Sequence, residues 1–391
     1  MGGSAFSATL PASACPRIPS AVYYVVKARL TAQLQSVFSI VSTPNEAPEK
    51  TDHGDLDFLV FGPLKEGIVE VPHEEVQQAL DAKHLVPMPG NRTSSYAIPI
   101  GKGEWATLGH GSEEEEARKA RSADDAEDIY YQVDVHVCLD KGEWERIQFF
   151  HGYGDLGMIM GLIARNKGLL WGVKGLKIPH PPRPPFDLCD NMDEILQYMG
   201  LPKAQWDAGF QTKKEIFEWV GTSPLFDPTR FQTEGQGIRK VKPERKMYAQ
   251  FVEWVRQQQQ YNSDPTPRGL EKQEQIEHAL AYFGKRAEWD AMIKEDADKA
   301  RLKEGFSGGK VRLWTGLPGE RWADLKKIMD QVRAWVGGEP GILKILEEKG
   351  EDGMKSYVLK AKEELGVVVA EQEVSDTIRG LEMLSMNSTS T

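Results

Sequence analysis

Cysteine is scarce in this sequence: the chain has three, Cys15, Cys138 and Cys189, and they lie far apart. An odd number at such spacing offers neither a framework of disulfide bonds nor the paired cysteines of a zinc motif, and it is typical of a reducing compartment. The first residues show no basic segment followed by an apolar run, so no signal peptide is indicated. We therefore expect an intracellular protein, in the cytoplasm or the nucleus.

Long apolar runs are also missing, since no stretch approaches the roughly 20 residues that span a bilayer, and we expect no membrane partner. An excess of positive charge is missing as well, because the formal net charge is -11. Proteins that bind many nucleic-acid phosphates present a basic face, so the charge argues against a broad nucleic-acid surface but allows a small basic patch. Hydrophobic residues at 40% and charged residues at 27% are instead typical of a globular protein.

Residues 1–180 alternate between helix-like and strand-like segments. Ser20 can cap a helix that carries a stripe of apolar residues, and residues 56–61 form an apolar strand. A second strand, with alternating apolar and polar residues, begins at Ile129. Between the two strands, the acidic stretch 101–128 predicts a solvated, disordered insertion.

A proline-rich run at 179–185 marks the predicted domain boundary, because it can continue neither a sheet nor a helix. Beyond it, residues 181–385 follow helical periodicity and strands are scarce. Helices are predicted near 192–199, 213–220, 246–261, 270–303, 320–336 and 352–365. The predicted fold class is therefore α+β: a small mixed sheet with flanking helices, followed by a mainly α-helical domain.

Two aspartates open the first apolar strand. Asp55 and Asp57 are two residues apart, and side chains alternate across a strand, so both point to one face while their apolar neighbours pack on the other. Asp134 lies within the second strand, where it shares a face with His136. A lone histidine in a strand is more often structural than functional, so His136 is a weaker candidate than the three acids.

If these two strands are neighbours, the three carboxylates converge on one polar face. Carboxylates so close repel one another unless cations lie among them, and hard divalent ions with oxygen ligands are the natural occupants. We therefore expect two Mg²⁺ or Mn²⁺ ions held by Asp55, Asp57 and Asp134. Such ions suit an in-line displacement at phosphorus, because they activate the attacking hydroxyl group and stabilise the leaving pyrophosphate.

Three motifs follow one another in the order Gly2-Gly3-Ser4, Asp55-Leu56-Asp57 and Val133-Asp134-Val135. In this order they resemble the DNA-polymerase-β-like nucleotidyltransferase superfamily. Its members carry a Gly-Gly-Ser turn, then a strand with two aspartates separated by one apolar residue, then a third carboxylate between apolar residues on a nearby strand. The resemblance covers residues 1–180, and it implies that they form a nucleotidyltransferase-like catalytic domain.

The resemblance also implies a role for each matching residue. Asp55 and Asp57 would ligate both metal ions, and Asp134 would help to activate the acceptor hydroxyl group. Gly3 and Ser4 would contact the triphosphate of the nucleotide through a backbone N–H group and a hydroxyl group, as in other phosphate-binding turns.

The activity implied is the transfer of a nucleoside monophosphate from an NTP, such as ATP, to an acceptor hydroxyl group. The acceptor stays open, because an RNA 3′ end, a protein hydroxyl group and a small alcohol all fit this chemistry. Residues 315–319, Thr-Gly-Leu-Pro-Gly, are faintly similar to a segment in the tail of CCA-adding enzymes and bacterial poly(A) polymerases. This similarity favours an RNA acceptor, recognised by the helical domain.

Two other functions fit parts of the pattern. A chain with a nucleotidyltransferase-like fold can bind a partner without catalysis. A metal-dependent glycosyltransferase also uses an Asp-x-Asp pair, but that pair usually lies in a loop after a strand, whereas Asp55 and Asp57 open one. A third acid such as Asp134 is not expected there. The sequence does not indicate an oligomeric state.

Overall fold

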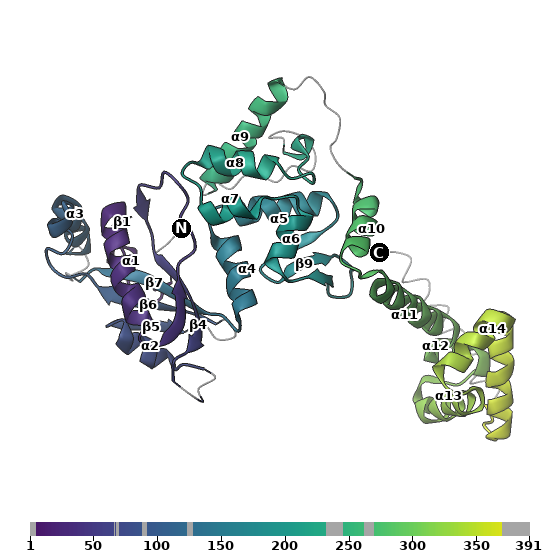
Figure 1. Cartoon of the computed structure of the whole chain (residues 1–391). Coiled ribbons are helices and arrows are strands. Elements are labelled where there is room, and N and C mark those ends of the chain that lie inside the picture. The colour runs from purple at the N-terminus through teal and green to yellow at the C-terminus, as the bar shows by residue number, and fades with distance from the viewer. Residues whose placement is uncertain are drawn as a thin grey trace. The chain divides into compact units, whose positions relative to one another are not determined.

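The chain forms two units, Met1–Gly284 and Lys285–Thr391, in the computed structural model (Figure 1). Residues 5–65, 67, 70–87, 92–122, 128–231, 245–261 and 270–369 are described. Helices occur together with a mixed sheet and the C-terminal region is helical, so the predicted α+β class is confirmed. In the described part of the chain no helix is both long and apolar enough to cross a membrane.

The division between the units lies after Gly284 and not at the proline-rich run. Beyond that run, α6 (Met192–Tyr198) packs against α4 (Lys141–His151) and β9 (Gly175–Ile178), both of which precede it in the first unit. The prolines therefore turn the chain without separating two compact bodies.

A mixed sheet lies at the centre of the first unit. Among the described residues it has five strands, in the order β2 (Phe38–Ser42), β4 (Leu56–Pro63), β7 (Tyr130–Val137), β6 (Thr93–Pro99) and β5 (His84–Pro87). β4 and β7 run parallel, and the other pairings in this sheet are antiparallel. The two strands expected to be neighbours therefore lie side by side, with Asp57 paired with Asp134.

One face of the sheet is covered by helices. Leu56 and Phe58 of β4 share this face with Val133 of β7, and they pack under α1 (Ser20–Leu34) and α2 (His73–Ala79). α1 supplies buried apolar side chains at helical spacing: Val22, Val26, Leu30 and Leu34. Each fully buried side chain of this kind stabilises the fold by about 1.5–3 kcal/mol relative to exposure. This core fixes which residues of β4 and β7 turn to the opposite face.

The opposite face is covered at its two ends. At one end, Tyr130 packs against Phe6 in the segment that precedes β1. At the other end, Leu59 and Cys138 pack against Ile147 of α4. Between these ends, alternate residues of β7 form a polar strip: Gln132, Asp134 and His136.

Smaller elements complete the first unit. Two further antiparallel sheets join β1 (Ile18–Pro19) to β3 (Asp52–His53), and β9 to both β8 (Leu170–Gly172) and β10 (Phe186–Cys189). Its other described helices are η1 (Ala12–Ala14), η2 (Ala106–Leu108), α3 (Gly111–Ser122), α5 (Leu156–Asn166), α7 (Lys203–Ala208), α8 (Lys213–Gly221), η3 (Pro228–Arg230), α9 (Lys246–Tyr261) and α10 (Lys272–Tyr282).

The second unit is helical, with α11 (Arg286–Gly305), α12 (Gly308–Thr315), η4 (Gly319–Arg321), α13 (Trp322–Val336) and α14 (Glu339–Glu364) around one apolar core. The single helix predicted over 270–303 is two helices, because Gly284 turns the chain with a φ of 66°. The helix predicted at 352–365 is the second half of α14, which changes direction at Gly350.

The acidic stretch 101–128 is ordered over residues 101–122, so the predicted disorder is wrong there; residues 123–127 lie outside the described part. η2 and α3 fold in this stretch. Trp105, just before η2, is buried, and its Nε1–H donates to the hydroxyl group of Tyr131 on β7 over 2.8 Å. The stretch is therefore anchored to the central sheet.

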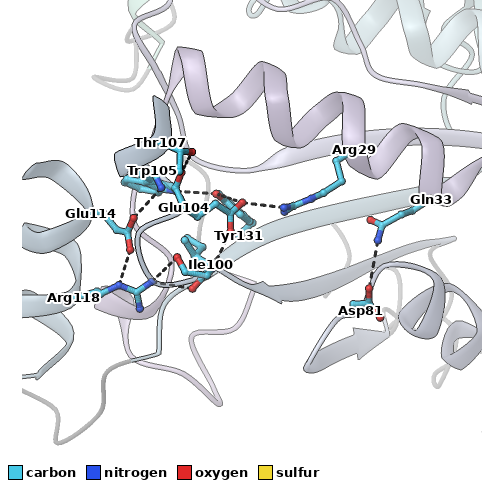
Figure 2. A network of polar contacts seen from close by, with 11 residues as sticks. Arg29, Gln33, Asp81, Ile100, Glu104, Trp105, Thr107, Glu114, Arg118 and Tyr131 are labelled. Atoms are coloured by element: carbon cyan, nitrogen blue, oxygen red, sulfur yellow. Dashed lines mark hydrogen bonds and ion pairs between the residues drawn. The ribbon is translucent and has the colours of Figure 1, made fainter. Parts of the chain in front are cut away.

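A buried glutamate organises this anchored segment (Figure 2). Glu114 accepts hydrogen bonds from the backbone N–H groups of Gly103 and Trp105, both at 2.8 Å, and from Arg118 Nε at 2.9 Å. Nearby, Glu104 Oε1 accepts from Arg29 Nη1 of α1 at 3.0 Å. A run of acidic residues predicts disorder only if its carboxylates stay in water. Glu114 is buried at low cost because these donors satisfy its carboxylate.

We predict that Glu114→Ala lowers the free energy of unfolding by about 3 kcal/mol, because it removes the acceptor of two backbone N–H groups and the carboxylate that pairs with Arg118, whose Nη2 keeps its backbone carbonyl partners. Urea unfolding followed by tryptophan fluorescence measures the loss. Glu115→Ala, at an exposed position in the same run, should change stability by less than about 0.5 kcal/mol. Equal losses in the two variants would contradict the structural role of Glu114.

Candidate metal centre

Asp55, Asp57 and Asp134 come together on the face of the sheet that carries the polar strip, and of the three Asp57 is exposed. The parallel register of β4 and β7 places Asp57 directly beside Asp134, and Asp55 immediately precedes β4. One carboxylate oxygen from each residue lies within 4.8 Å of the other two. The predicted convergence of these three side chains is therefore confirmed.

Asp134 is oriented by its neighbours on the same face. Gln132 Nε2 donates to its two carboxylate oxygens, over 3.3 and 3.2 Å. Ser95 lies opposite in β6, and its side chain lowers the pKa of this carboxylate, as Gln132 does. A donor such as Gln132 orients a carboxylate, as the outer partners of metal ligands do.

The three acids perturb one another electrostatically. Desolvation, followed by the charges of Asp55 and Asp134, raises the pKa of Asp57 to about 7. Desolvation also raises the pKa of Asp55 and of Asp134. Because the Asp57 side chain is exposed, water screens part of the burial effect, and repulsion from the two neighbouring carboxylates adds to it. Divalent cations, which reach an exposed carboxylate freely, would relieve this repulsion.

A second polar network supports the segment that leads into Asp55. Glu46 accepts a hydrogen bond from the Tyr23 hydroxyl group at 2.6 Å and another from Lys50 Nζ at 2.6 Å. The imidazole of His53 stacks on the Tyr23 ring with centroids 3.6 Å apart, and its Nδ1 lies 3.3 Å from Glu46. Burial alone would raise the pKa of Glu46, but the neighbouring His53 imidazole together with the hydrogen bonds from Lys50 and Tyr23 lowers it to about 2. The network ties residues 52–55 to α1.

These supporting residues were not singled out from the sequence. Tyr23, Glu46, Lys50 and His53 come from a helix, a loop and a two-residue strand, and no fixed spacing relates them. The available signal was His53 alone, which immediately precedes Gly54 and the aspartate pair.

Gly3 and Ser4 lie outside the described residues, so their contact with a triphosphate stays a prediction. The described chain starts at Ala5, whose N–H group donates to Gln132 Oε1 over 3.3 Å. Gln132 is the residue that donates to Asp134. The described N-terminal segment thus begins beside the partner of the third acid.

Compared with models of known protein families and with curated protein sequences, the chain matches none.

In the absence of divalent ions, we predict that Asp57→Asn raises the melting temperature, because it removes one of three repelling charges. The pKa of Asp57 is about 7 in the folded chain against 3.8 ordinarily, so between these values only the folded state holds the proton. Wild-type stability should therefore fall as the pH rises towards about 7. The difference in melting temperature between Asp57→Asn and the wild type, measured in EDTA by scanning calorimetry, should increase from about pH 5 to about pH 8.

Adding Mg²⁺ or Mn²⁺ at about pH 8 should raise the wild-type melting temperature and leave that of Asp57→Asn nearly unchanged. Asp52→Asn is the matched control, because Asp52 is half-exposed and pairs with Arg17 outside the cluster. It should respond to the ions as the wild type does. A wild-type protein that responds to neither ion would contradict the three ligands.

We also predict that Glu46→Gln lowers the free energy of unfolding by about 1–2 kcal/mol, since an amide keeps the shape but loses the charge that pairs with Lys50. The lowered pKa of Glu46 means that its contribution is present above its ordinary value of 4.5 and is lost as the pH falls towards about 2. Urea unfolding at neutral and acidic pH tests both statements. Glu49→Gln, which affects a more exposed ion pair with Lys213, should be nearly neutral at both.

Proposed function

We propose that this chain transfers a nucleoside monophosphate from an NTP to an acceptor hydroxyl group, at Mg²⁺ or Mn²⁺ ions bound by Asp55, Asp57 and Asp134. The observation that carries the proposal is the in-register parallel pairing of Asp57 with Asp134, with a carboxylate oxygen of Asp55 within 4.8 Å of one from each of them. Three oxygen donors on a rigid sheet are a suitable ligand set for two hard divalent ions.

The three aspartates fit such ions because they offer hard oxygen donors and because their mutual repulsion favours bound cations. Bound there, two ions would neutralise the triphosphate and lower the pKa of the attacking hydroxyl group. Asp55, Asp57 and Asp134 would supply the carboxylate oxygens that hold these ions. Gln132 would keep the Asp134 carboxylate oriented towards the other two acids. The exposed position of Asp57 leaves the cluster accessible to substrates.

A glycosyltransferase fits these observations less well. Its Asp-x-Asp pair lies in a loop, whereas Asp57 here belongs to β4 and is aligned with a third carboxylate. An RNA 3′ end is one acceptor that fits this chemistry. Residues 315–319, which suggested an RNA acceptor, connect α12 to η4, and Gly316 caps α12 with a φ of 67°. The need for a helix-ending glycine accounts for part of that motif.

The decisive experiment measures pyrophosphate release from each labelled NTP with Mg²⁺ or Mn²⁺, with and without total cellular RNA. The wild type and the Asp52→Asn control should release pyrophosphate. Asp57→Asn should be slower by about a thousandfold or more, because losing a ligand of the catalytic ions removes several kcal/mol of transition-state stabilisation. Label found in RNA would identify the acceptor class.

Unchanged turnover in Asp57→Asn would overturn the proposed catalytic role. A wild type that binds Mg²⁺ at the acids but releases no pyrophosphate under any of these conditions would favour the alternative of a binding protein with a non-catalytic site.

A further inference from the structure

A second group of ligand-type side chains lies on the same face of the sheet, beyond Asp134. His136 and Cys138 are two residues apart at the end of β7, so their side chains share one face. Glu143 lies in the first turn of α4, which Asp140 caps by accepting from the Glu143 N–H group. A ring nitrogen of His136, Sγ of Cys138 and a carboxylate oxygen of Glu143 all lie within 4.8 Å of one another.

The His136 ring is held by one nitrogen and leaves the other unused. Its Nδ1 lies 2.8 Å from Thr93 Oγ1 on the neighbouring strand β6. Its Nε2 is buried and has no hydrogen-bond partner among the described residues. A buried polar atom without a partner is unfavourable. When Nδ1 carries the proton and donates to Thr93, the Nε2 lone pair is free for a metal ion, the usual arrangement of ligating histidines.

Glu143 is oriented by two donors and keeps capacity for a further ligand. Arg92 Nη1 donates to Oε2 at 2.7 Å and Arg92 Nη2 donates to Oε1 at 2.5 Å. The Leu139 N–H group also donates to Oε2, at 2.6 Å. In the described part of the structure Oε1 accepts a single hydrogen bond, so one of its lone pairs remains. Arg92 thus orients the carboxylate of Glu143, as Thr93 orients the imidazole ring of His136.

Cys138 supplies the donor that distinguishes this group from the three acids. Its side chain is buried beside Leu59 and Ile147, which shields the thiol from solvent and from other thiols. A sulfur ligand with an imidazole and one carboxylate favours borderline transition metals and does not favour Mg²⁺. The cysteine spacing of the sequence excluded a zinc motif built from cysteine pairs, but it did not test a site of mixed ligands.

We propose that His136, Cys138 and Glu143 form a second metal site, of the zinc class, with a fourth position open to water. On binding, the Cys138 thiol releases its proton to solvent and a bond from sulfur to Zn²⁺ replaces the S–H bond. Tetrahedral ligand atoms at about 2.0–2.3 Å from zinc lie closer together than 4.8 Å, so small side-chain shifts complete the site. The ion would join the end of β7 to the first turn of α4. This site does not depend on nucleotidyl transfer.

The test is titration of the metal-free full chain with Co²⁺, followed through the near-ultraviolet charge-transfer band of a cobalt–thiolate bond. The band should saturate at one ion per chain and disappear when Zn²⁺ is added. Cys138→Ser should abolish it. Thr93→Val, which leaves the ligands in place but removes the partner of His136, should weaken Co²⁺ binding roughly 10–100-fold.

Two controls separate this site from others in the chain. Cys189→Ser removes a half-buried thiol elsewhere, and Asp57→Asn alters the acidic cluster, so both variants should keep the band. X-ray absorption of the zinc-loaded wild type requires no variant and should show one sulfur neighbour at about 2.3 Å. No band in the wild type, a band that persists in Cys138→Ser, or a zinc shell without sulfur would each overturn the proposal.

Discussion

The parallel pairing of β4 with β7 is the constraint on which the first unit depends. Its register places Asp57 beside Asp134, while Val133 and Val135, one residue to either side of Asp134, are buried under α1 and α2. A slip of one residue would bury Asp134 and expose both valines, at a cost of several kcal/mol. The residues that build the core therefore also decide which carboxylates meet.

A parallel pair requires a long connection, and here the connection helps to build the site. The chain between β4 and β7 includes β6, which pairs with the other edge of β7. From there Ser95 faces Asp134 and Thr93 faces His136. The stretch after β6 is fixed by the hydrogen bond from Trp105 to Tyr131. The polar strip is thus oriented from the connection between β4 and β7, and of these contacts only the Trp105 anchor belongs to the stretch 101–128 that sequence patterns assigned to an insertion.

The sequence predicted the acids better than their surroundings, for a physical reason. Asp57 and Asp134 interrupt apolar alternation, and alternation is a local pattern with a period of two residues. The partners of Glu46 and Glu114 are set by tertiary packing. No periodic pattern in the sequence therefore predicts that specific donors hold either carboxylate. The two compact units divide after Gly284 and not at the proline-rich run, since prolines show where the chain turns and not which helices pack together.

Arg92 helps two groups of candidate metal ligands to lie on one face of the sheet. Its guanidinium group pairs with both oxygens of Glu143, so that carboxylate adds little negative charge to the cluster around Asp134. The three aspartates offer only hard oxygen donors, whereas the group at the end of β7 adds sulfur and nitrogen. The ligand types would therefore select different ions. Mg²⁺ would prefer the three aspartates, and zinc-class ions would prefer His136, Cys138 and Glu143. Because His136 follows Asp134 by two residues on the same face, an ion at either group would stiffen the strand that carries both.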